Sequence, residues 1–217
     1  MHGYLSNKES WTAQISYFSK FYRVTALDFI GFGGAETLPS AYSVDDYASW
    51  LLAAMQALDL RTPHVVAHSF GCRVAIKTAS LQTDSFDKIL LTGAAGIILN
   101  RGVKYKMKVK AYRLIKKFAP RFAENHFGSK EYRSLSSTMK ESYKKIVNED
   151  LRFCAERVTN RVKIVQGEQD KTTPLAEAQI YMRHLPQASI QTMQGGHFAF
   201  AENPVQFNLI LEEFLYG

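Results

Sequence analysis

The stretch VVAHSFGCRVAIK, Val65 to Lys77, changes character at Ser69. An apolar run leads up to the serine and apolar residues at helical spacing follow it, which predicts a buried strand, an abrupt turn and a helix. Ala67 and Gly71 stand two positions to either side of Ser69, so the residues that would crowd a sharp turn are small. This pattern places the Ser69 hydroxyl at the apex of a strand-to-helix turn.

Short apolar segments elsewhere also indicate buried strands, and helical patterns lie between most of them. Together with His64–His68, the predicted strands are Arg23–Asp28, Lys88–Thr92, Val162–Gln166 and Ser189–Thr192. The predicted helices are Val44–Leu58, Phe70–Leu81, Leu175–His184 and Pro204–Leu215. Strands that alternate with helices of this length predict an α/β fold, with a mostly parallel sheet and helices on both faces.

The composition is that of a globular protein with one sizeable core. The chain has 217 residues, of which 46% are hydrophobic and 22% are charged. It contains no apolar run long enough for a transmembrane helix, and it does not start with a signal-peptide pattern. Two cysteines, Cys72 and Cys154, are too few for a disulfide framework or a zinc site, which fits a reducing compartment. We therefore expect a cytoplasmic protein without a metal.

The net charge of +7 is concentrated in one basic segment, Asn100–Asp150, which has 14 Lys and Arg against 5 Asp and Glu. Four apolar or aromatic residues within it stand at helical spacing among lysines, which predicts a stripe on a basic helix. These stripe residues are Tyr105, Val109, Tyr112 and Ile115. Because the segment interrupts the strand–helix alternation, we expect a helical insertion at residues 97–155 between two parts of a core, 1–96 and 156–217.

A serine, an acid and a histidine each follow a different predicted strand. Ser69 follows HVVAH, Asp170 follows VKIVQ, and His197 follows SIQT. Ligands of an open parallel sheet bind beyond the carboxyl ends of its strands, so these three side chains are expected to meet there. Imidazole can take the proton of a serine hydroxyl near neutral pH, and a carboxylate fixes the imidazole tautomer. The sequence thus predicts Ser69 as nucleophile, His197 as general base and Asp170 as orienting acid.

Other interpretations of these residues stay open at the level of sequence. Glu168 is a rival acid, and Asp170 could merely cap the helix that begins near Pro174. His68 is interpreted as structural, packed beside the turn, and both cysteines as non-catalytic. The lysines and arginines of the basic segment are typical of a solvated helix face as well as of a binding surface.

Taken together, the motifs resemble those of the α/β-hydrolase superfamily, of the lid-bearing, single-domain kind. AHSFG stands at the turn, GEQDKTTP at the acid, GGHF at the histidine, and HGYLSNKESW and DFIGFGGAE in the early loops. The G-x-S-x-G turn and the order Ser, Asp, His are the signature of that fold. Ala67 stands where the first glycine is usual and Cys72 replaces a common glycine, and both residues are small. The resemblance covers nearly the whole chain outside the basic segment.

This resemblance implies a serine hydrolase that works through an acyl-enzyme, with no metal or organic cofactor. Its substrate would be an ester, thioester, lactone or activated carbon–carbon bond of a small molecule. The backbone N–H groups of Tyr4 and Phe70 would form the oxyanion hole, and the stripe residues would line the pocket beneath a lid. There are two alternatives: an acyltransferase with the same triad, or a non-catalytic binding protein on a truncated hydrolase scaffold.

The expected partner is a small-molecule substrate that is acidic or bears an acyl chain. The stripe on the basic segment also permits contact with a membrane surface, whereas the sequence contains no nucleic-acid-binding motif.

The resemblance also implies that strands precede His2, because in that family the His-Gly turn follows the third strand. Only Met1 precedes His2 here. The third strand would lie between Arg23–Asp28 and His64–His68, so we expect an N-terminally truncated sheet with a gap or a rearranged pairing between these two segments. Unpaired backbone groups at such a gap cost stability.

Overall fold

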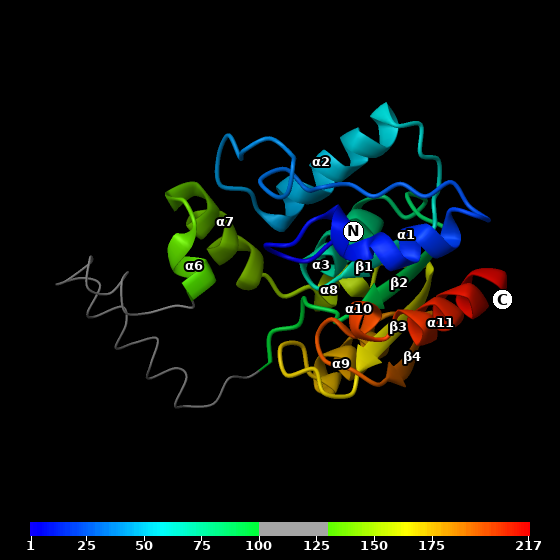
Figure 1. Cartoon of the computed structure of the whole chain (residues 1–217). Helices are drawn as coiled ribbons and strands as arrows, with labels where there is room; N and C mark the ends of the chain where they lie inside the picture. Colours follow the sequence, from blue (N-terminus) through cyan, green and yellow to red (C-terminus); the bar gives the residue numbers. More distant parts are fainter. Residues whose placement is uncertain (100–129) are drawn as a thin grey trace.

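Four parallel strands form a single sheet in this computed structural model, which describes residues 1–99 and 130–217 (Figure 1). The strands are β1 Val65–His68, β2 Lys88–Thr92, β3 Arg161–Gly167 and β4 Ala188–Met193, and they lie side by side in chain order. Ala67 lies opposite Leu91 in the register of the first pair, and Ile164 lies opposite Ile190 in that of the last. The predicted α/β fold with a parallel sheet is confirmed.

Helices cover both faces of this sheet, and alternate strand residues point to opposite faces. Ile89 and Leu91 of β2 belong to the larger apolar core, together with residues of α2 (Val44–Ala57), α3 (Phe70–Leu81), α8 (Arg152–Ala155) and α9 (Leu175–His184). Leu90 points the other way, into a second core with residues of α1 (Thr12–Phe18), α10 (Ala199–Glu202) and α11 (Pro204–Tyr216).

Local sequence signals place several of these helix ends. Ser43 and Asp46 form a reciprocal capping box at the start of α2, and Pro204 occupies the first turn of α11. The remaining helices of the described residues are η1 (Lys8–Trp11), α6 (Lys130–Ser134) and α7 (Ser137–Val147). Throughout residues 1–99 and 130–217, every helix is too short or too polar to cross a lipid bilayer.

The predicted strand Arg23–Asp28 is wrong, because this segment forms no strand. A mostly apolar cavity of about 390 Å³ separates it from β1, and the cavity is lined by residues 22–27 on one side and by Val65 and Val66 on the other. A strand exists only where a neighbour can pair with its backbone, and among the described residues no strand lies alongside this segment. The expected gap therefore occurs at this position, between β1 and residues 23–28.

Among the described residues, only Met1 continues the hydrogen bonding of the sheet beyond β1. Its ammonium nitrogen donates to the Val66 carbonyl at 2.6 Å, and its own carbonyl accepts from the His68 N–H at 3.0 Å, as a residue of a parallel strand would do. The Trp11 Nε1–H and the Gln14 Oε1 line the same cavity without a hydrogen-bond partner among the described residues. Burial lowers the pKa of the Met1 ammonium from 8.0 to about 5.

A short, apolar, β-branched peptide extension joined to Met1 should raise the melting temperature. It would turn the buried ammonium into an amide N–H, pair with the free edge of β1 and fill the cavity. Each kcal/mol gained should raise the melting point of a domain of this size by about 2–4 °C.

The gain should also depend on pH. Between pH 5 and 8 the unfolded ammonium binds more protons than the folded one, so the unextended chain loses stability as pH falls through that range. Extension should therefore help more at pH 6 than at pH 9. A Gly/Ser extension of the same length is the control, since it removes the charge without filling the cavity. Equal melting of the two extended chains would contradict strand pairing in the cavity.

Candidate active site

Ser69 stands in a strained backbone conformation between β1 and α3. Its φ of 50° lies in the left-handed region that residues with a side chain rarely adopt. The surroundings hold it there: the Ser69 N–H donates to the Thr92 carbonyl at 3.1 Å, and a Cβ at Gly71 would come within 2.9 Å of the carbonyl oxygens of Met1 and His2. Gly71 is therefore required for the close approach of the N-terminal loop to the turn. Strain of this kind clusters at functional sites.

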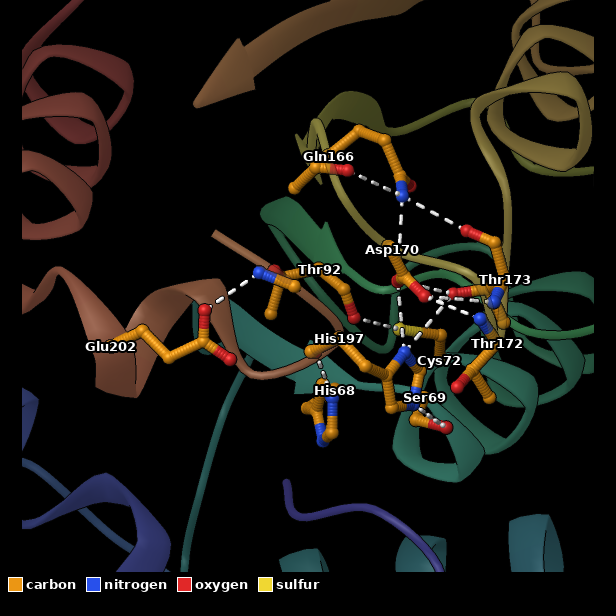
Figure 2. Close-up of polar contacts among 12 residues, drawn as sticks. His68, Ser69, Cys72, Thr92, Gln166, Asp170, Thr172, Thr173, His197 and Glu202 are labelled. Carbon is orange, nitrogen blue, oxygen red and sulfur yellow. Dashed lines mark hydrogen bonds and ion pairs between the residues drawn. The ribbon is translucent and has the colours of Figure 1, made fainter. Parts of the chain in front are cut away.

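The structure brings Ser69, His197 and Asp170 into one hydrogen-bonded chain (Figure 2). The Nε2 atom of His197 lies 3.0 Å from the Ser69 hydroxyl oxygen, and its Nδ1 atom lies 2.8 Å from Oδ2 of Asp170. Ser69 follows β1, Asp170 follows β3 and His197 follows β4, so all three stand beyond the carboxyl ends of parallel strands.

Asp170 is buried and receives several hydrogen bonds besides that of His197. The backbone N–H groups of Thr172 and Thr173 donate to its Oδ1 at 2.8 and 3.0 Å, and the Thr173 hydroxyl donates to its Oδ2 at 2.8 Å. Burial alone would raise the pKa of the carboxyl, but the bonds from His197 and Thr173 outweigh it and lower the pKa to about 2. Asp170 is therefore ionised at neutral pH.

The geometry does not fit the two alternative interpretations of the acid, a role for Glu168 or a capping role for Asp170. Glu168 is exposed, and the imidazole faces Asp170 instead. The N-cap of α9 is Pro174 and lacks a side-chain cap bond, so Asp170 does not cap that helix.

Backbone contacts hold the loop that carries His197. The Gly195 N–H donates to Oε1 of Gln169 at 2.9 Å, and the Gly196 N–H donates to Oε2 of Glu202 at 2.6 Å. Gly195 needs its glycine, because its φ is 129°. Sequence reasoning missed Glu202 and Thr173; the spacing of DKTT in the acid motif was a signal for Thr173, whereas nothing in the local sequence pointed to Glu202.

Tyr4 and Phe70, the two residues predicted for an oxyanion hole, both lie close to Ser69. Phe70 is the first residue of α3, and the ring of Tyr4 packs edge-on against the ring of Phe70 at 5.7 Å between centroids. Gly3 is close enough that an added Cβ would touch the Ser69 Cβ at 3.4 Å. The loop that carries Tyr4 therefore passes directly beside Ser69.

The predicted stripe residues Tyr105, Val109, Tyr112 and Ile115 lie outside the described residues. The described end of the basic segment includes α7, which contacts Tyr4: the Tyr4 hydroxyl donates to the Met139 carbonyl at 3.2 Å, and its ring lies 5.1 Å from that of Tyr143. The division into residues 1–96, 97–155 and 156–217 stays a prediction.

Two buried cations on α3 hold the far end of α7. Arg73 donates through Nη1 to the carbonyl oxygens of Ile146 and Glu149 at 2.9 and 2.8 Å. Lys77 pairs with the carboxylates of Asp45, at 3.1 Å, and Glu149. Within the part of the chain that the structure describes, no three His, Cys, Asp or Glu side chains gather as a metal site would need.

Comparison with known proteins shows the family of this chain. The model of the alpha/beta hydrolase fold family matches residues 1–151, well over half of the chain. The chain belongs to the alpha/beta hydrolase fold family.

Relatives within this family are distant from the chain. It is 22% identical to the 3-oxoadipate enol-lactonase 2 of Acinetobacter baylyi, a match covering 95% of the chain and 84% of the lactonase. An esterase from Exiguobacterium antarcticum has a TM-score of 0.79 at 19% identity, covering 100% of the chain and 90% of the esterase. A meta-cleavage product hydrolase from Pseudomonas fluorescens, solved with acetates, has a TM-score of 0.75 at 21% identity, covering 99% and 88%. These likenesses show the fold.

Asp170 should contribute stability that is present above about pH 4 and disappears as the pH falls toward 2. The pKa of the carboxyl is 3.8 as a reference and about 2 when folded, so below pH 4 the unfolded state binds more protons. Asp170→Asn should remove about 2–3 kcal/mol of this pH-dependent stability, as measured by urea unfolding at pH 7, 4 and 3. Glu168→Gln, which removes an exposed acid nearby, is the matched control. If the free energy of unfolding of Asp170→Asn depended on pH as that of the wild type does, the lowered pKa of Asp170 would be contradicted.

Proposed function

We propose that this protein is a serine hydrolase that cleaves an ester, thioester, lactone or activated carbon–carbon bond of a small molecule through an acyl-enzyme. The observation that supports it most directly is the hydrogen-bonded chain from Asp170 through His197 to Ser69, with Ser69 at the apex of a strained turn. Membership in a family with esterase and lactonase relatives points to the same chemistry.

Each residue has a defined task in this reaction. The Ser69 Oγ attacks the substrate carbonyl carbon while His197 Nε2 accepts the hydroxyl proton. Asp170, ionised and bonded to Nδ1, holds the imidazole in the tautomer whose Nε2 is free to accept, and it stabilises the imidazolium that forms. The N–H groups of Phe70 and Tyr4 stabilise the tetrahedral oxyanion.

In the remaining steps, His197 passes on the protons that it accepts. The imidazolium of His197 protonates the leaving group, and the acyl group stays on Ser69. A water molecule then gives a proton to His197 and attacks the acyl carbonyl, and His197 returns this proton to the Ser69 Oγ as the acid leaves. If an alcohol or a thiol replaced water in this step, the product would be a transferred acyl group, so analysis of products with and without such an acceptor separates hydrolase from acyltransferase.

The charge distribution favours an acidic substrate. The basic segment carries nine more positive than negative residues, and the rest of the chain is nearly balanced. A positive surface beside the site would raise the local concentration of anions. The similar meta-cleavage product hydrolase binds acetates, which are small carboxylates.

A fluorophosphonate probe should label the wild-type chain at Ser69 and leave Ser69→Ala unlabelled. Ser69→Ala and His197→Ala should each remove nearly all turnover of an ester substrate, and the double variant should be little worse than either, because the residues act as one unit. Ser85→Ala, at a buried serine outside the site, controls for non-specific labelling. Absence of labelling in the folded wild type would favour a non-catalytic binding protein, and additive losses would argue against a single catalytic unit.

Added salt should lower kcat/KM for an acidic ester and leave that for a neutral ester of similar size nearly unchanged. Salt screens exposed charges beyond about 8 Å at physiological ionic strength, which weakens the attraction of the basic segment for an anion. The measurement is a steady-state salt series on the two esters. The same response for both would reduce the basic segment to a solvated surface and leave the roles of Ser69, Asp170 and His197 unaffected.

A further inference from the structure

His68 is a buried titratable residue for which the proposed reaction has no use. It is the last residue of β1 and only 1% exposed, yet it directly precedes Ser69. Its Nε2 atom lies 2.9 Å from the backbone carbonyl oxygen of His197, and the two imidazole rings lie 4.7 Å apart (Figure 2). Because a carbonyl oxygen only accepts, the proton of the His68 ring sits on Nε2.

The opposite edge of the His68 ring faces the N-terminal loop. A Cβ at Gly3 would come within 2.8 Å of Nδ1, so the ring fills the space up to that backbone. Nδ1 has no hydrogen-bond partner among the described residues, and the rings of Phe198 and Phe200 lie 4.9 Å away on another side. The imidazole therefore spans the distance from the loop that leads to Tyr4 to the loop that carries His197.

This environment keeps the His68 ring neutral. Burial, reinforced by the nearby His197 ring, lowers its pKa to about 3. A second proton on Nδ1 would have no acceptor among the described residues, and a positive ring this close to His197 would oppose the imidazolium that forms there during turnover.

We propose that His68 is a positioning residue: its Nε2–H anchors the backbone of His197 and thereby sets the distance from the His197 imidazole to the Ser69 hydroxyl. An anchor is needed here because two glycines, Gly195 and Gly196, precede His197 and leave the loop backbone free to adopt other conformations. Gln169 and Glu202 hold those glycines, but within the described chain His68 is the residue whose side chain binds the carbonyl of His197 itself.

A pair of variants of equal length separates the hydrogen bond from the packing. In His68→Gln, the amide nitrogen stands as many bonds from Cα as Nε2 does, so it can donate to the same carbonyl. His68→Met has the same reach but no donor. We expect His68→Met to lower kcat/KM for an ester by about 10- to 100-fold, mainly through kcat, because small displacements of a general base are costly. We expect His68→Gln to restore most of this loss.

A second readout does not require turnover, which matters because the inference rests on the proposed function. The proton on Nδ1 of His197, in its bond to Asp170, should give a far-downfield proton resonance, assigned by its loss in His197→Ala. This signal should persist in His68→Gln and shift or broaden in His68→Met. His68→Asn, whose shorter amide cannot reach the carbonyl, should behave like His68→Met and supplies the comparison if His68→Met melts too low to study.

The outcomes separate the two proposals. An unlabelled, inactive wild type with a signal that responds to His68→Met would overturn the hydrolase assignment and support the positioning role. A wild type that is active, with the same kcat and the same resonance in His68→Met and His68→Asn, would overturn the positioning role and leave the hydrolase assignment standing. Equal losses in His68→Gln and His68→Met would also overturn it, since packing of the ring would then account for the effect.

Discussion

The strained turn at Ser69 is the constraint on which the rest of the structure depends. A residue with a side chain stays at a φ of 50° only when its neighbours leave it no alternative. The Thr92 carbonyl of the next strand, the first turn of α3 and the carbonyl oxygens of Met1 and His2 above Gly71 supply that enclosure. The turn therefore requires the edge of the sheet, the N-terminal loop and α3 to be in place together, and the Ser69 hydroxyl oxygen then lies 3.0 Å from Nε2 of His197.

Around this turn, the pKa values of two buried side chains are lowered. The shift keeps Asp170 negatively charged and His68 neutral. Asp170 is surrounded by donors, from Thr172, Thr173 and His197, which keep its negative charge in place. The His68 ring is buried, donates to one carbonyl and packs against two aromatic rings, and its Nδ1 has no partner among the described residues, so it stays uncharged. Among the described residues, the charge buried against the His197 imidazole is thus the negative one of Asp170, which would favour an imidazolium. Preorganised dipoles and charges of this kind need no rearrangement during the reaction.

The parts of the site that could be predicted from the sequence are those that follow from strand order. Ser69, Asp170 and His197 each come directly after an apolar segment, and parallel strands bring such positions to one edge. Glu202 and the anchoring contact of His68 depend on loop backbones, whose course is set by tertiary contacts. The prediction of a strand at Arg23–Asp28 was wrong for a related reason. Apolar composition indicates strand propensity, but a strand also needs a neighbour to pair with, and a cavity lies where that neighbour would be.

Helix α3 links the turn at Ser69 to α7. The strained Ser69 directly precedes its first turn, and Arg73 and Lys77 further along the helix bind the backbone and a carboxylate at the end of α7. At the other end of α7, Met139 and Tyr143 contact Tyr4, which stands beside the serine turn. Buried donors on Arg73 and Lys77 would be costly if left unpaired, so these contacts resist separation of α7 from the core. The position of α7 relative to Ser69 is therefore set by the core, and substitutions on the exposed face of α7 should leave the turn at Ser69 in place.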